Sequence, residues 1–217
     1  MEKIDFKDHQ HPGKLLVVSG MDGSGKSSMI GKLKERLALS GVDYIHTKQP
    51  TKQIRNFDLF NRYIYEPNSR DQIDYRALVC LMMGDRLQYI HSVIEPNLKQ
   101  GRLVICERYL ITSISEYIAR GFGSETWFYE LLKLVIKPDF SYYLDCRLAV
   151  LRERLSARED ARSSFIEHEH SVKLHQSFQK LIEEEIVTPL DSENVSPDSL
   201  VDRIMIDIFE SIKGTQN

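Results

Sequence analysis

A phosphate-binding loop lies close to the N-terminus of the chain. The sequence Gly-Met-Asp-Gly-Ser-Gly-Lys-Ser at residues 20–27 fits the pattern Gly-x-x-x-x-Gly-Lys-Ser/Thr. Glycines permit a tight turn in which backbone N–H groups converge on phosphate oxygens, and the helix that follows adds partial positive charge at its N-terminus. We expect the residues that bind a nucleoside triphosphate to be Gly20, Met21, Asp22, Gly23, Ser24, Gly25, Lys26, Ser27 and Ser28.

Two side chains of this loop have distinct expected roles. Lys26 would reach the β- and γ-phosphates, and the Ser27 hydroxyl would hold Mg²⁺. The alternative is a glycine-rich turn that fits the pattern by chance. The apolar run at 15–18 and the helical apolar spacing over 29–37 argue against it, because the motif requires a strand before the loop and a helix after it.

An arginine-rich stretch could surround a moving phosphoryl group with positive charge. Arg152, Arg154, Arg158 and Arg162 recur at helical spacing, and the planar arginine fork matches phosphate oxygens better than lysine does. Phosphoryl transfer needs such charge, together with the exclusion of water. Acidic residues stand among the arginines, so the alternative is a solvated helix face with i,i+4 ion pairs.

Two further pairs of residues could act on an acceptor. Glu107 and Arg108 end an apolar run that is typical of a buried strand, so Glu107 could orient Mg²⁺ and Arg108 could bind an acceptor phosphate. A structural ion pair is the alternative. Met82 and Arg86 lie one helical turn apart and share a face, which either lines a cleft for an acceptor nucleotide or packs against another helix.

Strand candidates alternate with helical segments along the chain. The strands are expected at residues 15–18, 42–46, 103–106, 140–145 and 186–190. This alternation predicts an α/β fold of three layers, with about five parallel strands and helices on both faces. Pro189 favours an edge position for the last strand. A long helix is expected to begin at Ser69, with Gln72 completing a capping box, and to continue to Pro96.

The composition is typical of one soluble domain. The chain has 217 residues, 41% of them hydrophobic, and a formal net charge of −3. We expect residues 1–13, which are polar, to form a flexible arm before a single domain over 14–217. No apolar run is long enough to span a bilayer, and the start has no signal-peptide pattern. A cytoplasmic protein without membrane or nucleic-acid partners is therefore expected.

The order of these signals resembles the thymidylate kinase family of P-loop nucleoside monophosphate kinases. The resemblance covers nearly the whole chain after the first dozen residues, and it rests on the phosphate loop, the arginine-rich stretch and the segments 47–50, 84–86, 107–109, 137–139 and 143–145. It implies a P-loop kinase fold with an arginine-rich lid at about 154–166. It also implies that the protein transfers a phosphoryl group from ATP·Mg²⁺ to a pyrimidine deoxynucleoside monophosphate. The leading candidate is dTMP, which would be converted to dTDP.

The resemblance further implies roles for individual residues. Asp22 would contact the acceptor sugar, Arg108 and Lys48 the acceptor phosphate, and Arg86 the acceptor nucleotide from the long helix. Gly23 stands where some relatives carry a catalytic arginine, so the missing charge is expected from the lid. Because the acceptor already bears a phosphate, no strong general base is needed. The catalytic residues are thus expected to be Lys26, Arg108, Arg158, Arg162 and Arg154.

Several acceptor-side residues depart from the family pattern. Met82 occupies the place of an aromatic that stacks on thymine in relatives, and Gln49 replaces a frequent Glu. Glu107 replaces Asp. Glu116 and Tyr117 stand where relatives have Tyr-Gln, and the tyrosine of relatives crowds the 2′ position of the sugar. Glu116 and Tyr117 are therefore expected near the acceptor, with base and sugar selectivity left open.

Two alternative functions are compatible with these residues. A deoxyribonucleoside kinase shares a phosphate loop, a Glu-Arg pair and an arginine lid, but it must deprotonate a 5′-hydroxyl, and Gln49 stands where its base would be wanted. The changed acceptor motifs also suit a catalytically silent nucleotide-binding regulator.

A homodimer is expected because family members usually pair through helices. Leu78, Val79, Leu81 and Met83 place apolar side chains on more than one side of the long helix, although burial within one chain explains them nearly as well.

Overall fold

Five parallel strands form the centre of the computed structural model, which describes residues 3–157 and 168–214. In spatial order they are β2 (Tyr44–Lys48), β3 (Leu103–Glu107), β1 (Lys14–Gly20), β4 (Phe140–Asp145) and β5 (Thr188–Asp191). All four neighbouring pairs run parallel, so the carboxyl ends of the five strands meet at one edge of the sheet, which we call the carboxyl edge. The parallel sheet and the edge position of the last strand, both predicted from the sequence, are confirmed.

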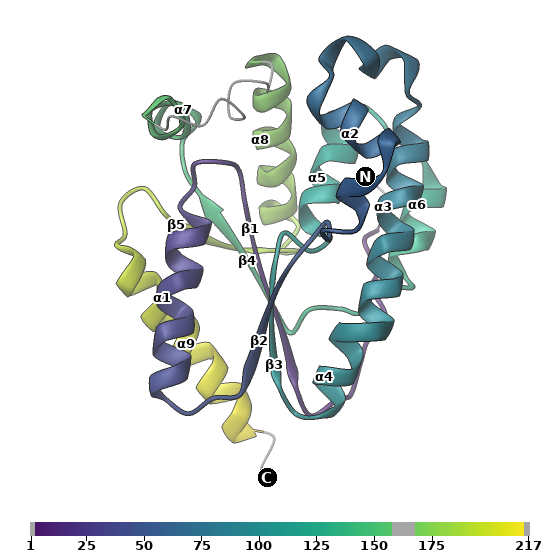
Figure 1. Cartoon of the computed structure of the whole chain (residues 1–217). Helices are drawn as coiled ribbons and strands as arrows, with labels where there is room; N and C mark the ends of the chain where they lie inside the picture. The colour runs from purple at the N-terminus through teal and green to yellow at the C-terminus, as the bar shows by residue number, and fades with distance from the viewer. Residues whose placement is uncertain (1–2, 158–167, 215–217) are drawn as a thin grey trace.

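Helices cover both faces of this sheet (Figure 1). One face packs against α1 (Lys26–Leu39) and α9 (Pro197–Gly214). The other face is covered by α3 (Tyr75–Tyr89), α4 (Glu95–Lys99), α5 (Ile111–Ala119), α6 (Thr126–Leu132) and α8 (His168–Glu183). Two short helices, α2 (Asp58–Tyr65) and α7 (Leu148–Ser156), lie beyond the carboxyl edge. The expected three layers are present, and none of the described helices is long and apolar enough to cross a membrane.

The strand β1 shows why a continuous apolar run predicts a buried strand. Leu15 and Val17 belong to the core under α3 to α6, whereas Leu16 and Val18 belong to the core under α1 and α9. All four side chains are fully buried. Because successive side chains of a strand point to opposite faces, a strand covered on both sides buries consecutive positions and therefore reads as an apolar run.

The long helix begins later than the capping-box pattern predicts. Residues 67–72 form a 3₁₀ turn, and α3 begins at Tyr75, where the Asp74 carboxylate accepts a hydrogen bond from the backbone N–H of Arg76 (2.9 Å). The Ser69 hydroxyl instead donates to the Glu66 carboxylate (3.0 Å). The predicted cap at Ser69 is wrong: Ser69, Asp71 and Asp74 are all residue types that cap helices, and α3 begins after Asp74.

The start of the chain is not the flexible arm predicted from its polar composition. Ile4 is 9% exposed and belongs to the main core. The backbone of Lys7 pairs with the segment before β4, donating to the Val135 carbonyl (2.9 Å) and accepting from the Lys137 N–H (2.8 Å). His9 lies 3.0 Å from the Asp139 carboxylate. Residues 3–13 thus pack on the domain, and they do so through backbone pairing that composition does not reveal.

Candidate active site

The phosphate loop lies between β1 and α1 at the carboxyl edge. Gly25 has φ 89° and provides the N-cap of α1, a left-handed conformation that glycine adopts without steric cost. The Lys26 side chain is 6% exposed, and its Nζ donates to the carbonyl oxygens of Gly20 (2.9 Å) and Met21 (2.7 Å). Ser27 and Ser28 are exposed in the first turn of α1. The loop therefore presents a helix N-terminus, two hydroxyls and one lysine to the same region.

Burial strongly affects the charge of Lys26. Desolvation, together with the positive charge of Arg108, lowers the pKa of Lys26 to about 7, although the carboxylates of Asp22 and Glu107 act in the opposite direction. A phosphate anion beside the ammonium group would favour the charged form. The protonation of Lys26 should consequently be coupled to the binding of the donor.

A cavity of about 390 Å³ adjoins the loop at Asp22. Its walls come from the ends of β2 and β3 and from α2, α3 and α5. The charged lining residues are Asp22, Lys48, Arg55, Arg86, Arg108, Glu116 and Arg120, and the apolar and aromatic ones include Phe60, Tyr63, Tyr75, Leu78 and Met82. A larger cavity of about 670 Å³ shares Tyr63, Tyr75 and Arg120 with it but contains no residue of the phosphate loop. The smaller cavity is therefore the candidate acceptor site.

Four charged side chains form the boundary between the loop and this cavity. The Arg108 Nη2 forms an ion pair with the Asp22 carboxylate, and the Lys48 Nζ lies 2.8 Å from the Glu107 Oε1. Burial raises the pKa of Asp22, but the positive charges of Arg108 and Lys26 outweigh that effect, so the net pKa is lowered. Arg108 adopts φ 70°, a left-handed conformation rare outside glycine and enriched at functional sites. All four sequence-predicted residues thus lie together.

Arg86 and Met82 both line the candidate acceptor cavity, which is the placement that a role at the acceptor would need. Arg86 is only 3% exposed. Its Nε donates to the Gln49 Oε1 (2.7 Å), and its Nη2 donates to the Tyr109 carbonyl oxygen (3.0 Å) and to the Ser113 Oγ (3.0 Å). The guanidinium therefore joins α3 to the ends of β2 and β3 and to α5.

Comparison with known proteins identifies the family to which this chain belongs. A family model described as thymidylate kinase matches residues 18–204. A probable thymidylate kinase of Pyrococcus abyssi is 34% identical over 151 residues, covering 67% of this chain and 71% of the relative. A thymidylate kinase of Staphylococcus epidermidis is 27% identical over 207 residues, covering 91% and 96% of the two chains. The chain belongs to the thymidylate kinase family.

Family membership makes the protein a nucleoside monophosphate kinase with ATP as the phosphate donor, as the sequence predicts. The family also supports ATP-dependent phosphorylation of dTMP, and it favours neither the deoxyribonucleoside kinase nor the silent regulator.

In this thymidylate kinase family member, Glu116 and Tyr117 lie on different sides of α5. Glu116 lines the acceptor cavity, as expected. Tyr117 is fully buried, stacks on Phe128 with 4.2 Å between ring centroids, and donates its hydroxyl proton to Glu125 (2.7 Å). The predicted placement of Tyr117 beside the acceptor is wrong, because neighbouring helical residues point about 100° apart and Glu116 takes the cavity side.

Two residues missed by the sequence analysis hold the Glu116 carboxylate. The His170 Nε2 lies 2.9 Å from Glu116 Oε2, and the Arg120 Nε lies 3.3 Å from the same atom. Burial raises the pKa of Glu116, but the hydrogen bond and charge of His170 and the charge of Arg120 outweigh it and lower the pKa. Arg120 could have been found from its i,i+4 spacing to Glu116. His170, in the first turn of α8, has no comparable local signal.

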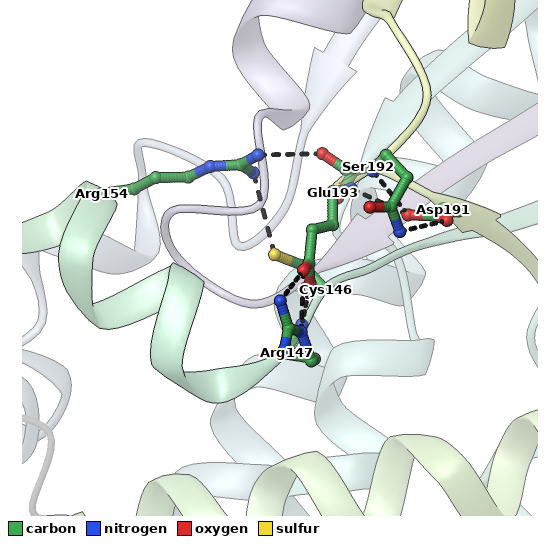
Figure 2. Close-up of polar contacts among 7 residues, drawn as sticks. Cys146, Arg147, Arg154, Asp191, Ser192 and Glu193 are labelled. Atoms are coloured by element: carbon green, nitrogen blue, oxygen red, sulfur yellow. Dashed lines mark hydrogen bonds and ion pairs between the residues drawn. The ribbon is translucent and has the colours of Figure 1, made fainter.

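The arginine-rich stretch is described only in part. Arg154 reaches from α7 to the segment after β5, where its Nη2 donates to the Ser192 carbonyl oxygen (3.0 Å) and its Nη1 lies 3.8 Å from the Cys146 Sγ (Figure 2). The expected residues Arg158 and Arg162 lie outside the described residues. These contacts favour a structural role for Arg154, because they connect α7 to the segments that follow β4 and β5.

Gly23 shows why this loop lacks the arginine of some relatives. Its φ is 87°, and a Cβ added there would lie 3.0 Å from the Leu151 carbonyl oxygen and 3.2 Å from the Leu155 Cγ. Helix α7 thus occupies the space that a side chain at this position would need. Both the backbone conformation and the close approach of α7 favour glycine over a residue with a Cβ.

Substitution of Gly23 by alanine is expected to destabilise the protein by about 1–3 kcal/mol and to weaken ATP binding, because the methyl group meets α7 and the backbone is strained. Urea unfolding and calorimetry with ATP measure the two effects. Gly41→Ala is the matched control, since Gly41 has φ 68° but no atom within 4 Å of the added Cβ. Equal losses of stability for the two variants would contradict a role for the contact with α7.

Binding of ATP at pH 8 is expected to take up about one proton. A lysine with a pKa of about 7 is mostly neutral at pH 8, and the triphosphate raises that pKa, so Lys26 takes a proton from solvent. Calorimetry in two buffers of different ionisation enthalpy gives the number of protons. Lys26→Met should take up none, and an unchanged uptake in this variant would refute the assignment.

Proposed function

We propose that the protein transfers the γ-phosphoryl group of ATP, bound with Mg²⁺, to the 5′-phosphate of dTMP. The observation that carries this proposal is the acceptor cavity, whose charged boundary adjoins the phosphate loop and whose lining also includes aromatic and apolar side chains. A nucleoside monophosphate has the same division, with an anionic phosphate at one end and a planar base at the other. The chain can therefore place an acceptor phosphate beside the donor phosphates.

The donor side follows from the phosphate loop. Backbone N–H groups of residues 20–28 and the N-terminus of α1 bind the phosphates, and Lys26 neutralises the charge that develops on the transferred group. Hydroxyl and carboxylate oxygens are the ligands that Mg²⁺ prefers, and Ser27 and Glu107 supply one of each at the carboxyl edge. When bound, the metal ion neutralises phosphate charge and orients the triphosphate.

The acceptor side follows from the charged boundary. Arg108 and Lys48 bind the acceptor phosphate, Asp22 accepts a hydrogen bond from the sugar, and Met82 packs against the base. Glu116 bounds the sugar side of the cavity. Positioning and charge neutralisation suffice for transfer, because the oxygen of the acceptor phosphate is itself the nucleophile.

Incubation with ATP·Mg²⁺ and a panel of nucleoside monophosphates tests the proposed reaction. We expect dTDP from dTMP, with slower conversion of other monophosphates and none of thymidine. Lys26→Met in the same assay excludes activity from a contaminating kinase. Failure to form a diphosphate from any member of the panel would refute the proposed function, and phosphorylation of thymidine but not dTMP would replace it by a nucleoside kinase.

A homodimer formed through α3 is also proposed. Leu78, Val79 and Met83 are buried within the chain, so they do not support it. The outer side of α3 instead carries the small exposed residues Ala77, Cys80 and Gly84, which let a second helix approach closely. Light scattering during size-exclusion chromatography measures the mass in solution, and the mass of one chain would contradict this proposal.

A further inference from the structure

Helix α5 has an arginine beside each of its ends, and both arginines line the acceptor cavity. Arg108 precedes the helix, and Arg120 is its C-cap. The helix has nine residues, so its rise separates its two ends by about 12 Å. A phosphate could therefore find a cation at two places in the cavity. Only Arg108 adjoins the phosphate loop, through its ion pair with Asp22.

Glu116 compensates the cation at the second place. Its Oε2 lies 3.3 Å from the Arg120 Nε and 2.9 Å from the His170 Nε2. Burial raises the pKa of the Glu116 carboxyl, but His170 and Arg120 together lower it more, so the group is ionised at neutral pH. The charge of Arg120 is thus neutralised by a carboxylate that itself lines the acceptor cavity.

Two other arginines of the cavity are poorly suited to draw a phosphate away from the loop. Arg86 is 3% exposed, and its guanidinium already makes three hydrogen bonds within the chain. Arg55 is exposed to solvent, where salt and water screen its charge. Arg120 is therefore the cation that would compete with Arg108 if Glu116 did not neutralise it.

We propose that Glu116 orients the acceptor, because its charge neutralises Arg120 and repels a phosphate from that end of the cavity. A phosphate monoester carries a charge of about −1.5 to −2 at pH 7. The carboxylate therefore disfavours a reversed acceptor whose base lies against Arg108, and specificity often depends on such a repulsive group. The inference rests on the proposed function and explains how one of two orientations is chosen.

His170 is a positioning residue for this carboxylate. It lies in the first turn of α8 and does not line the acceptor cavity. Its contact with Glu116 at 2.9 Å is shorter than the 3.3 Å contact of Arg120. His170 thus holds the charge of Glu116 in place without touching the acceptor.

Glu116→Gln keeps the shape of the side chain and removes its charge. We expect kcat and KM for dTMP to fall together, each by about 10-fold, the effect of one charge pair near a protein surface. Reversed acceptors would occupy the protein without reacting. The ratio kcat/KM compares the transition state with the free protein and acceptor, so it should stay within about twofold of the wild-type value. An unchanged kcat, or a large loss of kcat/KM, would overturn the proposal.

Removal of Arg120 from the same variant should reverse the effect. In the double variant Glu116→Gln with Arg120→Met, no cation remains at that end of α5, so kcat and KM should return toward the wild-type values. A disturbance of the fold would instead become larger with the second substitution, and this result would contradict the proposal. His170→Ala leaves Glu116 in place, and it should lower kcat and KM together by a smaller factor. It tests the proposal even if Glu116→Gln fails to fold, since a fall of kcat/KM would refute the positioning role.

Glu125→Gln is the matched control. Glu125 also forms an ion pair with an arginine, Arg76 at 3.4 Å, but it does not line the acceptor cavity. This variant should keep the kcat and KM of the wild-type protein. A joint fall of both constants, as in Glu116→Gln, would mean that the effect does not depend on the cavity.

Calorimetric binding of dTMP separates this inference from the proposed function. Glu116→Gln should bind dTMP about 10-fold more tightly than the wild-type protein, because a second orientation becomes available at an unpaired arginine. Addition of Arg120→Met should abolish this gain. The result would support the role of Glu116 even without turnover. Equal or weaker binding of dTMP by Glu116→Gln would refute that role although dTMP is phosphorylated.

Discussion

Replacement of Lys26 by methionine should reduce kcat for dTMP phosphorylation by about 10²- to 10³-fold, the usual loss when one group that stabilises transition-state charge is removed. The Lys26 Nζ is the buried ammonium at the centre of the phosphate loop, held by the carbonyl oxygens of Gly20 and Met21. Methionine fills similar space but carries no charge. Steady-state kinetics with ATP·Mg²⁺ and dTMP measure the effect.

Lys32→Met provides the control for that substitution. Lys32 lies on the same helix but is exposed, and its Nζ pairs with the Asp198 carboxylate at 2.7 Å. Its loss should leave kcat within about twofold, because exposed ion pairs contribute little. A Lys26→Met protein that is folded by circular dichroism yet retains wild-type kcat would contradict the role given to Lys26.

Arg86→Lys should lower the free energy of unfolding by about 3–5 kcal/mol and raise KM for dTMP, although it replaces one basic residue by another. A lysine ammonium cannot make the forked contacts to Gln49, Tyr109 and Ser113, and it would leave buried polar groups unpaired. Burial already lowers the pKa of Arg86, and lysine loses its proton more readily under the same burial. Urea unfolding and initial rates measure the two effects.

Arg203→Lys is the corresponding control on a surface helix. Arg203 is 62% exposed and lies 3.7 Å from Asp207, so the substitution should change the stability by no more than about 0.5 kcal/mol. Similar effects of the two substitutions would contradict the structural role of Arg86.

Much of the donor side could be predicted from the sequence because its determinants are local. The phosphate loop needs glycines, Lys26 and a hydroxyl in consecutive positions, and the apolar run before it forms a strand buried on both faces. The order of strands and helices along the chain also predicts a parallel sheet, since a parallel pair requires a crossover. Glu107 and Arg108 follow from the same rule, because they end a buried strand at the carboxyl edge.

Local sequence was insufficient to predict structure where two residues could cap the same helix, or where a residue contacts a segment far away in the chain. Ser69 and Asp74 are both suitable helix caps, and α3 begins after Asp74. Glu116 and Tyr117 are adjacent in the sequence, but they lie on different sides of α5. Tyr117 lies on the side that faces the core, whereas Glu116 faces the cavity. The polar start of the chain concealed the backbone pairing of Lys7 with the segment before β4.

The acceptor side was decided by contacts between residues far apart in the chain. The sequence alone predicts a nucleoside triphosphate site at residues 20–28, since such a site depends on one continuous turn and the helix after it. Only the tertiary structure placed Gln49 against Arg86, 37 residues later. That contact fixes the orientation of the Gln49 amide, because a guanidinium can only donate hydrogen bonds and the amide oxygen must therefore face it.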